Sequence, residues 1–323
     1  MDPTKGEWTS FAAHRQDRTY LPSRESCPFC PTRGGTPATE VPCDRYDIVV
    51  FDNKFPAFTT DPPSPSIEGN DPYEVAAAAG ASEVIVYSDD HDATMASLGV
   101  DRLARIIEVW ANRYANLGVR KEVSYVFIFE NKGVEVGVTL HHPHGQIYGY
   151  PEIPPVPLAE LNAARSYLEK HGRCVFCDQI GRERSDGVRV LGENESFLAF
   201  VPFPARFPYE TRIMSRRHAP SLLDLSDPER ARLAELMQAV LIGYDRLFGF
   251  PMPYVMAIHQ APTGDAKWLA VSHFHMEFYP PYRTSKKLKY LAGSELGAGA
   301  FLNDTVPEET AAELRRAMAA FDD

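Results

Sequence analysis

The chain has few basic residues relative to acidic ones and no long apolar runs, the features that mark nucleic-acid-binding proteins and membrane proteins. Positive charge is in the minority, with 33 Lys+Arg against 44 Asp+Glu and a formal net charge of −11 over 323 residues. Because phosphate backbones attract basic surfaces, this balance argues against broad binding to nucleic acid or to an anionic membrane. The longest apolar runs, such as 84–87 and 125–129, are far shorter than the ~18–20 residues that span a bilayer. We therefore expect neither nucleic acid nor a membrane as a partner.

An apolar signal segment is also missing from the start of the sequence. The first residues, Met-Asp-Pro-Thr-Lys-Gly-Glu-Trp, are polar, which predicts a cytoplasmic location. A hydrophobic content of 44% and a charged content of 24% are typical of an ordinary folded protein. At roughly 100–200 residues per domain, the length suggests about two domains.

Cysteine is scarce, but its arrangement is regular. Four of the five cysteines form two Cys-x-x-Cys pairs, Cys27 with Cys30 and Cys174 with Cys177. In a reducing compartment such pairs indicate metal or redox chemistry before structural disulfides. The fifth, Cys43, stands alone, and we expect it to be a small core residue, as free cysteines commonly are.

The two halves of the chain repeat the same features in the same order. The first half contains Cys27-Pro-Phe-Cys30, Asn53-Lys-Phe-Pro-Ala-Phe58, His91 and His142-Pro-His144. The second contains Cys174-Val-Phe-Cys177, Asn194-Glu-Ser-Phe-Leu-Ala-Phe200, His218 and His273-Phe-His275. A duplicated domain is the simplest explanation.

Periodicity predicts strands and helices in both halves. Runs of β-branched and aromatic residues predict strands at 47–51, 83–87, 124–130, 145–150, 196–202, 254–259 and 273–279. Apolar residues at helical spacing predict helices over 101–117, after Asp227 as N-cap with Pro228 at the first helical position, and over 307–320. The segment 59–72 is rich in Pro, Asp and Ser, which predicts a surface loop.

The block His-Pro-His-Gly-Gln at 142–146 is the most specific motif in the chain. If it runs into a strand, alternation sends His142, His144 and Gln146 to one face, with successive members about 6–7 Å apart. An isolated His-x-His pair is as often a hydrogen-bonded core pair as a functional one. Three polar groups in a row on one strand face indicate a function.

The block and several other motifs, in one order over nearly the whole chain, resemble the galactose-1-phosphate uridylyltransferase family of the histidine-triad superfamily. The other motifs are Gly6-Glu7-Trp8, His14-Arg15-x-x-Arg18, Cys27-x-x-Cys30, Phe129-Glu130-Asn131-Lys132-Gly133, Gly137, His259-x-Ala261-Pro262 and His275-x-Glu277-Phe278-Tyr279-Pro280-Pro281. The resemblance implies an α+β fold of two tandem histidine-triad-like domains, over 1–155 and 156–323, with antiparallel sheets and flanking helices.

The resemblance implies that His144 is a nucleophile and that Gln146 binds the phosphoryl oxygens. A neutral imidazole, with an ordinary pKa near 6.5, can attack the α-phosphorus of a UDP-sugar such as UDP-glucose or UDP-galactose. UMP held on the histidine would then pass to another hexose 1-phosphate in a ping-pong exchange. Hydrolases of the superfamily carry a third His where Gln146 stands, so the residue favours a transferase over a hydrolase.

Three sets of side chains are candidate metal ligands. The resemblance implies a structural zinc ion on Cys27, Cys30, His91 and His142, because two thiolates and two imidazoles suit tetrahedral Zn²⁺. Internal symmetry offers a second zinc set, or its degenerate remnant, at Cys174, Cys177, His218 and His273. Well-known family members lack the second Cys pair and instead hold another metal, iron, at positions that match Glu160, His259, His275 and Glu277. Glu277 replaces the usual His there, although carboxylates also bind Fe and Zn.

The resemblance also implies substrate contacts and a homodimer. Nucleotide contacts match Arg15, Arg18, Asn53, Phe55, Asn131, Gly137 and Thr139, where Thr139 replaces a more usual Ser. Lys289 matches a phosphate-contacting lysine, although a Lys run such as 286–289 also fits a solvated face. In the family these arginines and the late lysine reach across a dimer interface. A family Gln is replaced around Phe301–Asn303, so the sequence leaves the exact hexose open.

Three other hypotheses about function remain beside the exchange of UMP between UDP-glucose and galactose 1-phosphate. A nucleotidyltransferase or phosphorylase for another sugar 1-phosphate fits the retained Arg15, Arg18 and Asn131 together with altered late residues. A zinc-stabilised protein that only binds nucleotides does not need a nucleophile such as His144. A nucleotide hydrolase is disfavoured by Gln146.

Overall fold

The computed structural model describes residues 1–18, 20–34 and 38–319, and it is built on nine strands. Those of the first half are β1 (Val49–Asp52), β2 (Ala81–Val86), β3 (Tyr125–Lys132) and β4 (His144–Tyr150). Those of the second are β5 (Val190–Glu193), β6 (Phe197–Phe200), β7 (Thr211–Ser215), β8 (Tyr254–His259) and β9 (His275–Tyr279). The predicted strand at 254–259 is confirmed at both ends. Their β-branched and aromatic residues suit a pleated surface that is buried.

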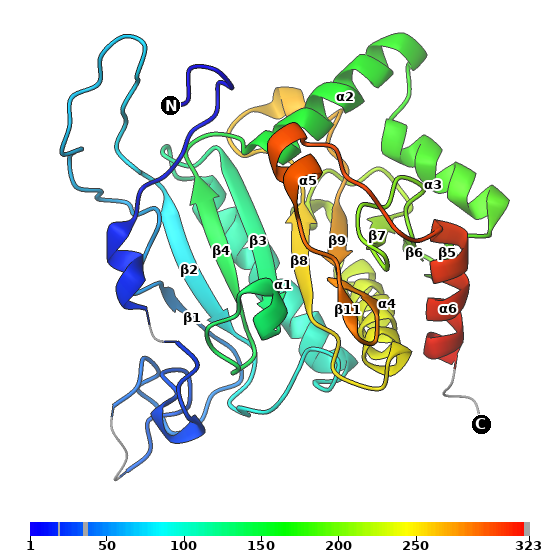
Figure 1. Cartoon of the computed structure of the whole chain (residues 1–323), viewed down its shortest axis with the longest axis horizontal. Coiled ribbons are helices and arrows are strands. Elements are labelled where there is room, and N and C mark those ends of the chain that lie inside the picture. Colours follow the sequence, from blue (N-terminus) through cyan, green and yellow to red (C-terminus); the bar gives the residue numbers. More distant parts are fainter. Residues whose placement is uncertain (19, 35–37, 320–323) are drawn as a thin grey trace.

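All nine strands belong to one antiparallel sheet, in the order β1-β2-β4-β3-β8-β9-β7-β6-β5 (Figure 1). The halves meet where β3 pairs with β8, for example Ile128 with Ile258. This mixture of helices and antiparallel sheet confirms the predicted α+β fold. The division at residue 155 falls at the start of the helix after β4 and stays a prediction.

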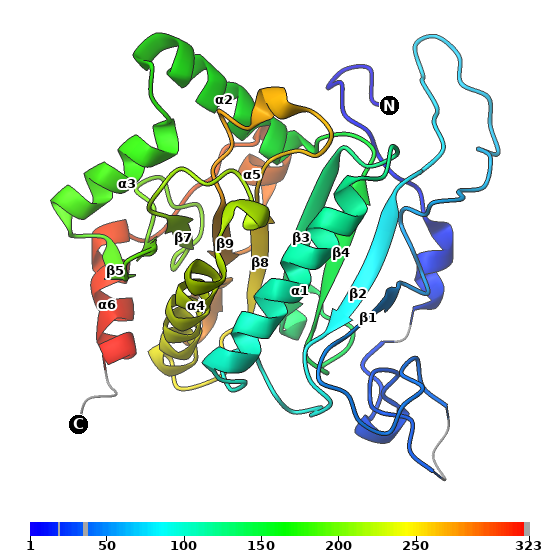
Figure 2. The same cartoon turned by 180° about the vertical axis from the view of Figure 1, so that it is seen from behind.

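Two long helices, α1 (Val100–Gly118) and α4 (Asp227–Leu247), lie side by side on one face of the sheet (Figure 2). Their apolar stripes, including Trp110 and Met237, are fully buried in the main core. The start of α4 differs from the prediction, because its N-cap is Ser226 rather than Asp227. Glu229 Oε2 accepts there from the backbone N–H and from the hydroxyl of Ser226, each at 2.8 Å, which pairs one backbone donor at the start of the helix.

The other helices cover the second half. Helices α2 (Pro155–His171) and α3 (Val175–Asp186) pack on the opposite face of β6 and β7, through Leu161 and Phe176 against Leu198 and Met214. Helix α6 (Pro307–Ala319) packs against α4 and β5; residue 320 of the predicted helix lies outside the described residues. No helix in the described part of the chain combines the length and the apolar character that crossing a bilayer requires.

Short elements complete the fold. They are the ribbon of β10 (Tyr282–Thr284) and β11 (Lys287–Leu288), the helix α5 (Gly293–Ala298), and the 3-10 turns Ala13–Asp17, Arg24–Ser26, Val134–Val136, Leu222–Asp224 and Ala266–Trp268. The predicted loop at 59–72 contains neither a helix nor a strand, which confirms the prediction. Cys43 is exposed, so the prediction of a core residue is wrong, because this part of the chain is irregular and lies outside the sheet.

Candidate functional site

Strand β4 presents alternate faces to two different environments. Ile147 points into the main core, whereas His144, Gln146 and Tyr148 line a cavity on the face opposite α1. The glycine between the first two is required, because a Cβ at Gly145 would lie 2.1 Å from the hydroxyl oxygen of Tyr87. The alternation predicted from the motif therefore carries the side chains of His144 and Gln146 into one cavity.

His144 is held in one orientation by its own strand. Its Nδ1 donates to the backbone carbonyl of His142 at 2.8 Å, which leaves Nε2 as the ring nitrogen with a free lone pair. The ring of Phe29 lies edge-on against it, with the centroids 5.0 Å apart. Burial lowers the pKa of His144 below the ordinary imidazole value. The imidazole is therefore neutral at pH 7 and able to act as a nucleophile.

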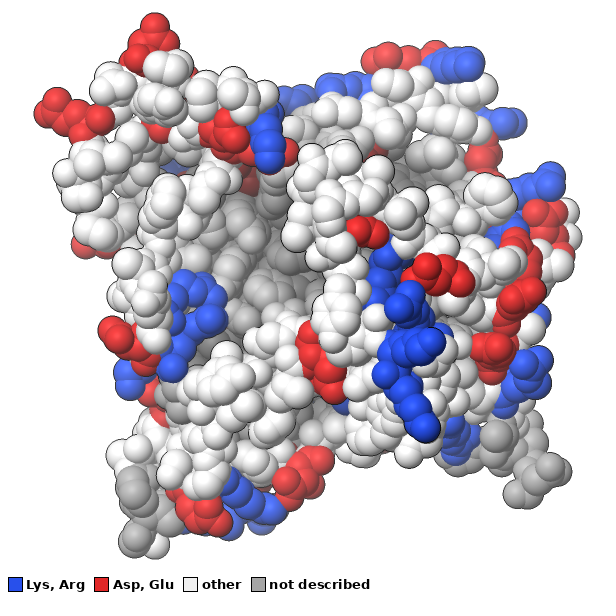
Figure 3. Space-filling model, viewed as in Figure 1, with Lys and Arg blue, Asp and Glu red and all other residues white. Residues whose placement is uncertain are grey.

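The cavity around His144 has a volume of about 520 Å³ and contains most of the predicted substrate contacts. The ones on its wall are Arg15, Arg18, Asn131, Gly137 and Thr139. An adjoining cavity of about 400 Å³ shares Arg18, Thr139, His144 and Gln146 and adds Asn53 and Phe55. Figure 3 shows a hollow on this face of the molecule with basic side chains on both sides. Two connected cavities meet at His144 and Gln146.

The two arginines line the cavity of their own chain, and Arg15 Nη1 donates to the hydroxyl of Tyr148 at 2.9 Å. The amino-terminal segment runs back past the pocket face of β4, where His14 Nε2 contacts the carbonyl oxygen of Pro56 at 3.0 Å. The cavity of a single chain therefore already contains positive charge. That these arginines also reach across a dimer interface stays a prediction.

Lys289 lines neither of these cavities. Its side chain is buried, where it pairs with Glu295 at 3.2 Å and donates to the carbonyl of Leu302, so it is not part of a solvated face. The segment after it is also used for packing. Asn303 Nδ2 donates to the carbonyl of Ala205 at 3.0 Å, and the ring of Phe301 lies under the guanidinium of Arg206.

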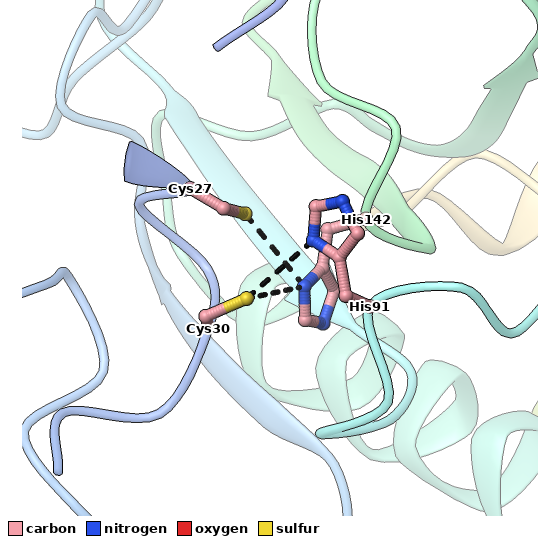
Figure 4. Close-up of side chains that lie close together, drawn as sticks. All are labelled: Cys27, Cys30, His91 and His142. Carbon is pink, nitrogen blue, oxygen red and sulfur yellow. Dashed lines mark hydrogen bonds between the residues drawn. The ribbon is translucent and has the colours of Figure 1, made fainter. Parts of the chain in front are cut away.

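The first metal set is assembled from three separate segments around the start of β4. Figure 4 shows the thiols of Cys27 and Cys30 pointing at the rings of His91 and His142. The Sγ to Nδ1 distances are 3.4 Å for Cys30 to His91, 3.6 Å for Cys30 to His142 and 3.7 Å for Cys27 to His142. A tetrahedral zinc with ordinary bond lengths requires about 3.5 Å between such atoms. The four side chains fit a zinc ion.

The other ring nitrogen of His142 orients the ring so that Nδ1 can bind a metal. Nε2 lies 2.7 Å from the carbonyl oxygen of Ser88 and 2.9 Å from the hydroxyl of Tyr46, so Nδ1 turns its lone pair toward the two thiols. Burial lowers the pKa of His142 to about 4, which keeps the ring neutral. Metal-binding histidines are commonly oriented in this way by a second hydrogen bond. A bound metal would tie the 27–30 turn and the 88–92 segment to the strand of His144.

The second half repeats this arrangement. The thiols of Cys174 and Cys177 both lie 3.7 Å from Nδ1 of His273, and His218 completes a group able to hold a metal. Nε2 of His273 contacts the carbonyl of Ser215 at 2.6 Å, as His142 contacts Ser88. These ligand atoms lie within 4.8 Å of one another. The second set therefore retains the geometry of the first.

The third set lies between α2, β8 and β9. The ligand atoms of Glu160, His259, His275 and Glu277 lie within 4.8 Å of one another, and all of these side chains except the half-buried Glu160 are buried. Glu160 and His259 are in direct contact at 2.7 Å, and Glu277 also pairs with Arg212 at 2.9 Å. Although burial lowers it, the charges of Glu160 and Glu277 raise the pKa of His259 to about 9. Two carboxylates and two imidazoles suit Fe or Zn.

Sequence reasoning missed several residues that surround these sites. Tyr148 continues the alternation of His144 and Gln146, so the same period of two could have identified it. Arg212 and Ser88 carry no motif, because only the sheet register and the end of β2 bring them to the metal sets.

Comparison with known proteins agrees with this geometry. The family model described as galactose-1-phosphate uridyl transferase, N-terminal domain, matches residues 2–154, and the one described as its C-terminal domain matches residues 160–322. The galactose-1-phosphate uridylyltransferase of Thermotoga maritima is 38% identical over 314 residues, which is 97% of this chain and 96% of that protein. The protein of that name from Rattus norvegicus is 31% identical over 330 residues, 97% of this chain and 86% of the relative.

Solved structures agree as well. A uridylyltransferase structure superposes with a TM-score of 0.88 at 37% identity, covering all of this chain and 98% of the other. An ADP-glucose phosphorylase from Arabidopsis thaliana has the same fold, with a TM-score of 0.75 at 22% identity over 98% of this chain and 96% of the other. By its sequence, by both family models and by its fold, this chain belongs to the galactose-1-phosphate uridyl transferase family.

Proposed function

We propose that this chain exchanges UMP between UDP-glucose and galactose 1-phosphate through a covalent uridylyl group on His144. The observation that carries the proposal is the hydrogen bond from His144 Nδ1 to the carbonyl of His142, at 2.8 Å. It leaves Nε2 as the nucleophilic atom in a cavity whose wall contains Arg15, Arg18 and Gln146. A neutral imidazole beside cationic and amide donors suits attack on phosphorus.

The exchange takes two displacements. The Nε2 lone pair of His144 attacks the α-phosphorus of UDP-glucose, a P–N bond forms, and the bond from phosphorus to the bridging oxygen breaks, which releases glucose 1-phosphate. In the second step a phosphate oxygen of galactose 1-phosphate attacks the same phosphorus. The P–N bond breaks, UDP-galactose leaves, and the imidazole returns to its neutral form.

The other cavity residues bind and orient the substrate in this proposal. Arg15 and Arg18 neutralise the phosphates, and Gln146 donates to the phosphoryl oxygens without acting as an acid or base. Asn53 and Phe55 bind the nucleoside in the adjoining cavity, while Asn131, Gly137 and Thr139 complete the wall of the cavity around His144. Lys289 does not reach this cavity, so its phosphate contact requires the homodimer that we also propose.

The metal sets support this site from outside the cavity. We propose structural zinc on Cys27, Cys30, His91 and His142, a second zinc ion on the matching cysteines and histidines of the second half, and a further Zn or Fe on the third set. Zinc supplies cross-links between segments, and none of the three sets contains His144. We also propose a cytoplasmic location.

A second candidate is a nucleotidyltransferase or phosphorylase for another sugar 1-phosphate. It is favoured by the packing of the late segment, where Asn303 and Phe301 contact residues 205–206 of their own chain rather than the cavity. The two candidates share the chemistry at His144 and differ in the acceptor or in the nucleotide donor.

Intact-mass spectrometry tests both. Wild-type protein and the His144→Ala variant are mixed with UDP-glucose without an acceptor, and the mass of one uridylyl group is expected on the wild type alone. Galactose 1-phosphate should then discharge it. An adduct that galactose 1-phosphate leaves in place would favour the second candidate. The absence of any adduct on the wild type would contradict the first candidate and favour a different nucleotide donor or a protein that only binds nucleotides.

A further inference from the structure

We propose that Tyr148 is a positioning residue for uridylyl transfer: its hydroxyl holds the side-chain carbonyl of Gln146, so that the amide NH₂ group is the end that faces the transferred phosphoryl group. The inference rests on the proposed function, because it assigns a role in that reaction. It concerns a residue outside every motif of the sequence analysis, two positions after Gln146 on β4.

The contacts form a chain of three side chains across the cavity wall. Arg15 Nη1 donates to the Tyr148 hydroxyl at 2.9 Å, and that hydroxyl donates to Oε1 of Gln146 at 3.0 Å. The aromatic ring is fixed independently of these bonds, since Phe129 and Phe58 contact it edge-on with centroids 5.1 Å and 6.2 Å away. Only 6% of Tyr148 is exposed, so the hydroxyl stays where the ring holds it.

The direction of these hydrogen bonds follows from the donors that are present. A guanidinium has only donors, so Arg15 obliges the Tyr148 oxygen to accept. The single hydroxyl proton is then free to go to Gln146, whose oxygen accepts it. Were the amide turned round, its NH₂ group would meet the hydroxyl, and the hydroxyl proton would lose its acceptor. Leaving a buried donor unpaired costs about 1–3 kcal/mol.

This arrangement decides what Gln146 offers to a substrate. With Oε1 occupied by Tyr148, the amide nitrogen makes no hydrogen bond to any side chain or backbone group among the described residues. It is left to donate into the cavity, where charge develops on phosphoryl oxygens during transfer. The opposite orientation would present the carbonyl oxygen to those oxygens, which repels them. A donor fixed before the reaction stabilises the transition state more than a mobile one.

The second half contains the same relation in another chemical form. Tyr279, two positions after Glu277 on β9, donates its hydroxyl to Oε2 of Glu277. A carboxylate has no donor end, so a tyrosine at this position cannot select an orientation there. Only on β4, where the partner is an amide, does the same bond distinguish a donor end from an acceptor end. The selection is therefore confined to the half that contains the nucleophile.

The test compares Tyr148→Phe with Tyr87→Phe. Tyr148→Phe keeps the packed ring and removes the hydroxyl; kcat for exchange between UDP-glucose and galactose 1-phosphate is expected to fall roughly ten- to a hundredfold, less than loss of the donor itself. KM should stay within about threefold, because the lost interaction acts in the transition state. Tyr87→Phe removes a hydroxyl that lies against Gly145 from the core side and has no hydrogen-bond partner among the described residues. It should leave kcat unchanged.

A double variant separates positioning from a general structural effect. In a Gln146→Ala background, Tyr148→Phe should cause no further loss beyond about twofold, because its effect passes through the amide. Independent losses that multiply would overturn the inference, as would a single Tyr148→Phe variant with at least a third of the wild-type kcat.

A spectroscopic measurement keeps this result distinct from failure of the proposed function. In protein labelled with ¹⁵N at the glutamine side chains, Tyr148→Phe should shift the amide resonance of Gln146, one of five glutamines, and leave the other four in place. An unmoved resonance overturns the hydrogen bond. If the wild type exchanges no UMP but the resonance moves, the proposed function fails while the orientation of Gln146 stands.

Discussion

The backbone carbonyl of His142 accepts a hydrogen bond from Nδ1 of His144, at 2.8 Å. His142 thus belongs to two systems: its ring faces the thiols of Cys27 and Cys30, and its carbonyl orients the nucleophile. His273 and His275 repeat the relation at 2.8 Å in the second half. Because His142 contacts both the metal set and His144, loss of the metal should disturb the orientation of His144 and lower the exchange rate.

The first prediction follows from this coupling. Cys27→Ser should lower zinc content by one ion per chain, the melting temperature by more than about 5 °C, and the exchange rate together, because metal binding contributes to folding and anchors His142. His144→Ala should abolish exchange while zinc content and melting temperature stay at the wild-type values. Metal analysis, thermal unfolding and the exchange assay measure the three quantities.

Cys43→Ser is the matched control for the cysteine variant. Cys43 is exposed and belongs to none of the three metal sets, so its replacement should change none of the three quantities. If Cys27→Ser keeps its full zinc and its melting temperature, the first set does not hold the metal.

The second set should bind its own metal ion independently. Cys174→Ser alone is expected to remove one ion per chain, that of the second set, and to leave the ion of the first set in place. The reason is that the two sets share no residue and lie in different halves of the sheet. Exchange should fall less than in Cys27→Ser, since His273 orients His275 rather than the nucleophile. Equal metal content in Cys174→Ser and the wild type would identify the second set as a remnant of the duplication.

Gly145 gives a prediction about packing beneath the nucleophile. In Gly145→Ala the new Cβ would lie 2.1 Å from the Tyr87 hydroxyl oxygen and 3.0 Å from the carbonyl oxygen of Phe129, so β4 must shift. Overpacking of this kind typically costs about 1–3 kcal/mol, and His144 should move with the strand. We expect lower stability and a loss of exchange. Adding Tyr87→Phe should restore part of both, and a double variant no better than Gly145→Ala would locate the strain elsewhere.

Local patterns predicted most of the sheet but not how its halves meet. The runs at 83–87, 124–130 and 254–259 became β2, β3 and β8, because each is rich in residues that suit a buried pleated strand. The strand β7 was missed, since Thr-Arg-Ile-Met-Ser has a charged residue in its second position. Helices α2 and α3 were also missed, because their buried residues are few and their apolar stripes weak.

The site was predictable where neighbours in sequence share a strand face. His144 and Gln146 reach one cavity because a strand alternates. The third set was beyond such reasoning without the resemblance, because it depends on the register that places His259 opposite His275. The contact of Tyr148 with Arg15 depends on the path of the amino-terminal segment, which has neither helix periodicity nor strand alternation to reveal it.

Glu130 should make stability depend on pH. It lies on β3 with its side chain in the core, where Oε1 accepts from Tyr254 at 3.3 Å and Oε2 has no hydrogen-bond partner among the described residues. Burial raises the pKa of Glu130 to about 8, against the smaller opposing effects of Lys132 and Tyr254. The other groups nearby are Tyr87, whose pKa is raised by burial and by the same carboxyl, and Asp245, which pairs with Lys132 at 2.8 Å.

The sign follows from the two states of the carboxyl. Above an ordinary glutamate pKa of about 4.3, the unfolded chain loses this proton while the folded chain keeps it up to about pH 8. The free energy of unfolding should therefore fall as pH rises through this window, by up to about 1.4 kcal/mol per pH unit for this group. Glu130→Gln removes the titration. In urea unfolding at pH 5 and pH 8, the free energy of unfolding of the variant relative to the wild type should therefore be higher at pH 8 than at pH 5. An unchanged difference between the two proteins at both values would mean that Glu130 is ionised in the folded state.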